Sequence, residues 1–113
     1  MPHASELYID FISKRHSLRE SVSLPAIDPL EERLVEIIAS ASESNKPLSV
    51  TELINMSELG SPTTLHQRLT MLRTKGWIEL AYTNNARRRQ LQLTPDGFRY
   101  FDKLAKCMIS SIR

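Results

Sequence analysis

Residues 61–94 read SPTTLHQRLTMLRTKGWIELAYTNNARRRQLQLT, and this stretch decides the fold. Its first half predicts a helix over residues 62–75. Ser61 suits the N-cap position, and Pro62 suits the first helical position because the N–H that proline lacks has no partner there in any helix. Gly76 is the expected C-terminal stop.

The two faces of this expected helix differ in character. Leu65, Leu69 and Leu72 recur at i, i+4 and i+7, which predicts one buried stripe. The opposite face is polar and mostly uncharged, although Glu and Lys would give a solvent face better helix propensity. Such side chains can exchange hydrogen bonds with base edges in a DNA major groove. They are Thr63, His66, Gln67, Thr70 and Thr74.

A hairpin is expected to follow this helix. Residues 77–82 and 90–94 read as two short strands, and pairing Leu80 with Leu91 leaves residues 84–87 as the tip. A tighter turn centred on the two asparagines is the alternative, because Asn tolerates positive φ, but it would set Leu80 opposite an arginine. The longer tip is therefore preferred.

Capping patterns predict further helices on both sides of this stretch. Asp28 with Glu31, and Ser49 with Glu52, have the spacing of capping boxes. The helix that begins after Ser49 is short, and with the next helix it has the spacing of a helix-turn-helix. Thr94 is the expected N-cap of the last helix.

The helix after Asp28 is acidic, and we expect its charged face to point away from DNA or against a basic partner. The acidic residues are Glu31, Glu32, Glu36 and Glu43.

The two terminal helices carry broad apolar faces. Residues 1–24 are expected to form an amphipathic arm, which either packs on its own domain or mediates dimerisation. Residues 25–113 form the remaining domain, whose last helix is more apolar than a small core requires. We therefore expect a homodimer. The expected contact residues are Leu7, Phe11, Met108 and Ile112.

Length and composition favour one small cytoplasmic domain. The chain has 113 residues and is 41% hydrophobic, without an apolar run of transmembrane length or a recognisable secretory signal. A single cysteine, Cys107, cannot form an internal disulfide. The histidines and this cysteine lack the close paired spacing of zinc ligands, so no metal or other cofactor is expected.

The formal charge of +2 conceals an asymmetry. Residues 1–60 contain 5 basic and 10 acidic residues, a net charge of −5, whereas residues 61–90 contain 6 basic and 1 acidic, a net charge of +5. The positive block coincides with the expected helix and hairpin. This coincidence favours a nucleic acid as the partner, because phosphates attract clustered cations.

A helix with a polar face followed directly by a basic hairpin resembles the winged helix-turn-helix domains of bacterial transcription regulators, and is most similar to the MarR-like branch. The similarity covers roughly residues 28–106. It rests on SVTE at 49–52, SPTT at 61–64, KGWIEL at 75–80, the arginine-bearing wing and LTPDG at 93–97.

The resemblance implies an α+β, mostly helical fold: a winged helix-turn-helix with a two- to three-stranded antiparallel sheet and flanking N- and C-terminal helices. It also implies a homodimer on a pseudo-palindromic operator. The function expected is that of a sequence-specific regulator of transcription that binds double-stranded DNA. The recognition helix, residues 62–75, would lie in the major groove, and the wing, residues 83–89, on the backbone or in the minor groove. The expected DNA contacts are Ser61, Pro62, Thr63, His66, Gln67, Thr70, Arg73, Arg87, Arg88 and Arg89.

Two other classes of function compete with DNA binding. Winged helices also serve as protein-interaction modules, but such a module would not need three consecutive arginines beside a polar helix face. An enzyme should show convergent carboxylates, a nucleophile with its base, or a metal cluster, and the sequence shows none of these. No membrane partner is expected, and the sequence assigns no small-molecule effector.

Overall fold

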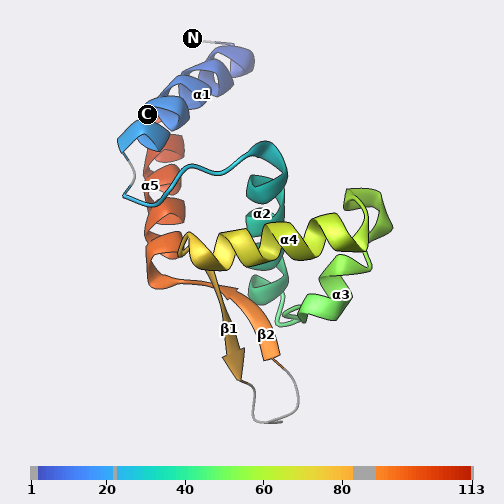
Figure 1. Ribbon diagram of the computed structural model, residues 1–113. Coiled ribbons are helices and arrows are strands. Elements are labelled where there is room, and N and C mark those ends of the chain that lie inside the picture. The colour runs from blue at the N-terminus through green and yellow to red at the C-terminus, as the bar shows by residue number, and fades with distance from the viewer. Residues whose placement is uncertain (1–2, 22, 83–88, 113) are drawn as a thin grey trace.

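The computed structural model describes residues 3–21, 23–82 and 89–112. Its elements in chain order are α1 (Ala4–Ser21), α2 (Pro29–Glu43), α3 (Val50–Ile54), the 3-10 helix η1 (Ser57–Leu59), α4 (Pro62–Thr74), β1 (Ile78–Tyr82), β2 (Arg89–Leu93) and α5 (Pro95–Ile112). In Figure 1, α4 crosses α2 in the middle of the molecule, the hairpin projects at one end, and α1 lies at the other. The mostly helical α+β fold with a two-stranded antiparallel sheet and flanking terminal helices is confirmed.

Side-chain caps begin four helices where the sequence predicts them, including α5, where the Thr94 hydroxyl accepts from the Gly97 N–H at 3.0 Å. At the start of α2, the Asp28 carboxylate accepts from the Glu31 N–H at 2.8 Å, and the Glu31 carboxylate accepts from the Asp28 N–H at 2.9 Å. Ser49 and Glu52 form the same reciprocal pair before α3. The Ser61 hydroxyl accepts from a backbone N–H in the first turn of α4. Each cap satisfies donors that would otherwise lack a partner, and is worth about 1 kcal/mol.

The core lies between α2, α4 and the hairpin. Leu65, Leu69 and Leu72 form the predicted buried stripe of α4, with exposed fractions of 0%, 2% and 0%. From α2, Leu34 and Ile38 complete the contact, and both are at most 1% exposed. Full burial of each of these side chains contributes about 1.5–3 kcal/mol, so this packing is the main force that holds α4 in place.

The register of the hairpin follows the sequence pattern. Leu80 pairs with Leu91 as predicted, and Ile78 pairs with Leu93. The Leu91 N–H also donates to the Leu48 carbonyl at 2.8 Å. Among the described residues the sheet has two strands, and Leu48 adds one hydrogen bond at the edge of β2 without forming a third strand. The predicted tip at residues 84–87 and the alternative turn within it lie outside the described residues.

The junctions at the two ends of the hairpin, with α4 and with α5, each depend on one glycine. Gly76 has a φ of +85°, which lets the chain turn from α4 into β1. At Gly97, a Cβ atom would stand 2.7 Å from the Trp77 carbonyl oxygen, so only glycine fits against that backbone. The Trp77 ring is buried between Tyr100, at a centroid distance of 5.1 Å, and the Pro25 carbonyl, to which its N–H donates.

The terminal helices pack against each other within one chain. The Ser111 hydroxyl of α5 donates to the Asp10 carboxylate of α1 at 2.8 Å, and Lys14 donates to Ser110 at 3.0 Å. On the outer side of this pair, large apolar side chains stay exposed. They are Tyr8, Ile9, Ile12, Met108, Ile109 and Ile112. Leu7 and Phe11, in contrast, are half-buried. No helix in the described ranges is long and apolar enough to cross a membrane.

Candidate nucleic-acid interface

The polar face of α4, defined by Thr63, His66, Gln67, Thr70 and Thr74, is exposed along its whole length. Ser61 and Pro62 are exposed just before it, and Arg73 is exposed near its C-terminal end. All predicted contact residues on α4 therefore lie at the surface, opposite the buried leucine stripe. The helix is 13 residues long, which corresponds to about 20 Å.

Hydrogen bonds within the helix occupy some of these polar groups. The Thr70 hydroxyl donates to the His66 carbonyl and the Thr74 hydroxyl to the Thr70 carbonyl, both at 3.0 Å. These threonines can still accept hydrogen bonds, and their methyl groups can make apolar contacts. The side chains of His66 and Gln67 have no recorded hydrogen bond to any residue that the structure describes, so they present both donors and acceptors to a partner.

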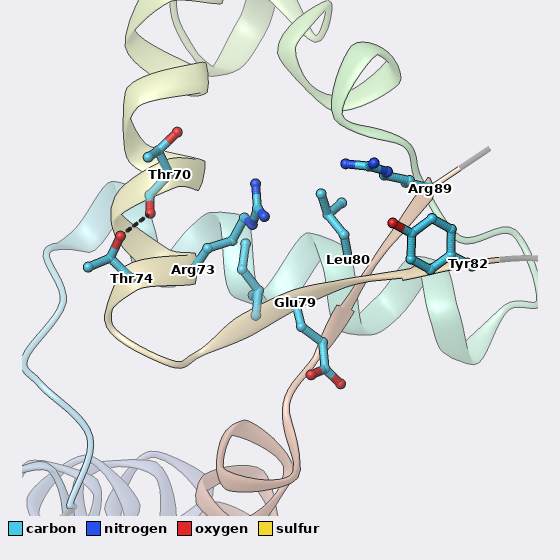
Figure 2. A pocket seen from close by; sticks show the side chains of 8 residues that line it. Thr70, Arg73, Thr74, Glu79, Leu80, Tyr82 and Arg89 are labelled. Carbon is cyan, nitrogen blue, oxygen red and sulfur yellow. Dashed lines mark hydrogen bonds between the residues drawn. The ribbon is translucent and has the colours of Figure 1, made fainter. Parts of the chain in front are cut away.

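An open groove of about 600 Å³ continues from the polar face to the hairpin. Figure 2 shows Arg73 on α4 and Arg89 on β2 at opposite sides of this groove, with Leu80 between them. The Arg89 guanidinium lies 5.3 Å from the centroid of the Tyr82 ring, a distance at which the ring attracts the cation. The Glu79 carboxylate points away from the arginines and accepts from Gln92 at 2.8 Å. The groove thus has cationic sides, without a carboxylate directed between them.

Two of the six basic residues in the positive block face inward and are not available to phosphate. Arg68 pairs with Asp28, and Lys75 donates to Glu31 at 3.1 Å. Among the described residues, this leaves Arg73 and Arg89 without a recorded ion pair. The predicted contacts Arg87 and Arg88 lie outside the described residues.

Of the two orientations expected for the acidic side chains of α2, Glu31 takes the one against basic groups, and these groups are Arg68 and Lys75 of the same chain. The Glu31 side chain is 1% exposed, because it caps α2 and pairs with cations from α4. Glu32 pairs with Arg19 of α1, whereas Glu36 and Glu43 are exposed as expected.

Arg68 is the residue whose role the sequence pattern did not reveal. It stands three residues after Leu65 and four before Leu72, a spacing that places it on the inward side of α4. This position beside the leucine stripe was the signal that could have separated it from the surface cations.

Burial and pairing act in opposite directions on Arg19. Its partial burial favours the neutral form, but hydrogen bonds with Tyr100 and Glu32 outweigh it and raise the pKa of the guanidinium. Arg19 therefore stays charged, and it links α1 to both α2 and α5. Within the described ranges, no group of three His, Cys, Asp or Glu side chains is placed to hold a metal ion.

Several solved structures share this arrangement, and bacterial transcriptional regulators are among them. A transcriptional regulator of Thermotoga maritima superposes with a TM-score of 0.64 at 16% identity, over 93% of this chain and 68% of that one. A MarR-like transcriptional regulator of the same organism gives 0.59 at 14% identity, over 99% and 82%. The YusO protein of Bacillus subtilis gives 0.53 at 16% identity, over 96% and 69%.

At these identities the similarity shows the fold, which is the winged helix-turn-helix of MarR-like regulators. It confirms the resemblance found in the sequence. No protein-family model matches the sequence, and no curated protein matches it.

Proposed function

We propose that the protein is a transcriptional regulator that binds double-stranded DNA in a sequence-specific manner. The observation that carries this proposal is the continuity between the polar face of α4 and the groove between Arg73 and Arg89. The first of these surfaces is suited to base edges and the second to phosphates. The fold shared with solved transcriptional regulators supports the same function.

In this proposal, α4 enters the major groove with its N-terminal turns first. A groove about 12 Å wide admits one α-helix, and the side chains of the first two turns then reach base edges. His66 and Gln67 are the residues that contact base edges, since their hydrogen-bonding groups face outward. Ser61, Pro62 and Thr63 approach the adjacent backbone or bases, and Thr70 lies further along the groove. Arg73 and the wing, residues 83–89, contact phosphates or the minor groove.

We further propose that the regulator acts as a homodimer in the cytoplasm. The exposed apolar side chains of α1 and α5 would then be covered by a second copy, with Met108 and Ile112 central. Leu7 and Phe11 are half-buried, so they would line the edge of that contact. Two copies related by a twofold axis would present their α4 helices to half-sites about 34–36 Å apart on one side of the duplex.

The salt dependence of binding tests the proposal. Preferred sites are first selected from a random duplex library, and affinity is then measured against salt for wild type, Arg73→Gln and Arg89→Gln. Each variant should flatten the slope of log affinity against log salt by about 0.9 for every phosphate that it no longer neutralises. Replacement of Arg87, Arg88 and Arg89 together by Ala should flatten it further, and should weaken binding to all sequences alike.

Arg15→Gln is the matched control, because Arg15 lies on α1, at the opposite end of the molecule from the hairpin. Its salt slope should equal that of wild type. If all variants share one slope, the groove does not contact DNA. If the wild-type protein selects no site and binds duplexes no better than an unrelated protein of equal charge, the fold serves a different purpose, for which a protein-interaction module is the alternative.

A further inference from the structure

Glu31 ties the first turn of α2 to Arg68 within α4 and to Lys75, the C-cap residue of α4. Its carboxylate accepts from the Lys75 ammonium at 3.1 and 3.2 Å, and one oxygen lies 3.9 Å from an Arg68 guanidinium nitrogen. Arg68 also pairs with the neighbouring Asp28, and Lys75 donates to the Ala26 carbonyl at 3.0 Å. Glu31 is 1% exposed and Lys75 is 22% exposed, so solvent screens their contact little, whereas Arg68 and Asp28 are each 34% exposed and their pair is screened more. We name Asp28, Glu31, Arg68 and Lys75 the α2–α4 clamp.

The clamp holds α4 at two separate places along its axis. Arg68 and Lys75 are seven residues apart, which puts them on one side of the helix about 10 Å from each other. A single contact would leave the helix free to pivot, whereas two contacts with the same short segment limit both rotation about the axis and sliding along it. Both cations lie on the inward side of α4, away from the polar face.

The leucine stripe alone does not impose this precision. Apolar attraction has no direction, so burial of Leu65, Leu69 and Leu72 determines which side of α4 faces the core more strictly than the exact rotation of the helix. Hydrogen bonds between charged groups weaken steeply when their distance and angle change. At a radius of roughly 5–6 Å, a rotation of about 20° moves a side-chain tip by about 2 Å, which is enough to break a hydrogen bond to a base.

We infer that Glu31 is a positioning residue, which fixes the rotation of α4 through Lys75 and Arg68 and thereby sets how sharply the protein discriminates between DNA sequences. The inference rests on the proposed function. Phosphate contacts tolerate a shifted helix, because Arg73 and Arg89 have long side chains and attract charge over some distance. Base contacts do not tolerate it, so disruption of the clamp affects discrimination more than overall affinity.

Glu31→Gln is the primary variant. Glutamine keeps the size of the side chain and an oxygen that can accept from the Asp28 N–H, but it removes the charge that faces Lys75 and Arg68. We expect the ratio of affinities for a selected site and a scrambled duplex to fall about tenfold, since each misplaced base contact costs a factor of about 5 to 150. Affinity for the scrambled duplex should stay within about twofold of wild type.

Three further variants make the experiment specific to the clamp. Glu36→Gln makes the same chemical change at an exposed position on α2 and should leave the ratio unchanged. Lys75→Met should reduce the ratio as Glu31→Gln does. The double variant should lose no more discrimination than the more impaired single variant, because either single change already breaks the contact between Glu31 and Lys75. It also leaves neither member of the pair as an unmatched charge, so it carries the test if a single variant does not fold.

All affinities are measured at a temperature at which circular dichroism shows each variant folded. A folded Glu31→Gln variant with the wild-type ratio would overturn the inference, as would losses on selected and scrambled DNA in equal proportion. A wild-type protein without any preferred site would overturn the proposed function together with the inference. A selective wild-type protein and an equally selective variant would overturn the inference alone.

Discussion

The polar face of α4 and the outer side of the α1–α5 pair are both exposed, but they differ in chemistry and in the packing that lies beneath them. The first carries short polar side chains beside a groove with two arginines. The second carries large apolar side chains, among them Ile112 at 70% exposure. A surface of the first kind suits a charged, hydrogen-bonding ligand such as DNA, and one of the second kind suits another apolar protein surface.

The packing beneath these two surfaces also differs, because it is more completely buried under α4 than between α1 and α5. Under α4 lie three almost fully buried leucines and the α2–α4 clamp. Between α1 and α5 lie half-buried side chains such as Leu7 and Phe11, and polar contacts such as that of the exposed Asp10 with the buried Ser111. The difference teaches that α4 is held by buried packing and ion pairs within its own chain, whereas the terminal pair presents an apolar face that its own chain leaves uncovered.

The largest expected effect is on stability beneath α4. Leu65→Ala removes a side chain that is 0% exposed, so we expect the free energy of unfolding to fall by about 2–5 kcal/mol. Leu104→Ala in α5 removes a partly exposed side chain and should cost about 1 kcal/mol. Denaturation in urea, followed by circular dichroism, measures both values. Equal losses in the free energy of unfolding would show that the packing under α4 and the packing of α5 contribute equally to stability.

The next effect concerns assembly. Met108→Glu combined with Ile112→Glu places two charges on the exposed face of α5 and should convert a dimer into a folded monomer. Sedimentation velocity at micromolar concentration measures the change. Met71→Glu is the control, because Met71 is also an exposed apolar side chain but lies on α4. If wild type sediments as a stable monomer, the outer side of α1 and α5 is not a dimer interface.

A smaller effect is expected on the polar face itself. Gln67→Ala should cost about 1–3 kcal/mol of binding free energy on the preferred operator, since a glutamine side chain can pair with adenine through one donor and one acceptor. Preference should relax at one position in each half-site, and binding to unrelated sequences should barely change. Selection from a random library with both proteins tests this. Identical base-preference profiles would show that Gln67 reads no base.

The smallest effect is a pH dependence in the α1–α5 pair. Hydrogen bonds from Lys14 and Ser111 lower the pKa of Asp10 below its ordinary value of 3.8, and the charge of Lys14 adds to this. A lowered pKa in the folded state stabilises the protein above the unfolded-state value, and this stabilisation is lost as the pH falls through the folded-state pKa. Asp10→Asn should therefore be slightly less stable than wild type at pH 7.

The stability difference between Asp10→Asn and wild type should disappear as the pH falls below 3.8 and through the lowered pKa. Urea denaturation at a series of pH values measures it. Asp102→Asn on α5 is the control, because it makes the same chemical change at an exposed position without a hydrogen bond or ion pair to any of the described residues. A difference that stays constant down to about pH 2 would assign the effect of Asp10→Asn to packing.

Much of the fold could be predicted from the sequence because its determinants are local. Ser61, Pro62 and the leucine repeat define α4 within a few residues of chain, and the capping boxes at Asp28 and Ser49 do the same for α2 and α3. The pairing of Leu80 with Leu91 follows from strand alternation, and the structure confirms it. Exposure of the polar face of α4 follows in turn from burial of the opposite stripe.

Other features depend on residues far apart in the chain, and local patterns do not encode them. By sequence, Arg68 and Lys75 belong to a basic surface, whereas packing of α4 on α2 brings them to Asp28 and Glu31, 40 and 44 residues away. The same packing buries Glu31, which by sequence is an ordinary residue of an acidic helix. Helix periodicity determined which side chains share a face, but only the tertiary structure decided which charges meet across faces, because ion pairs depend on distances between elements.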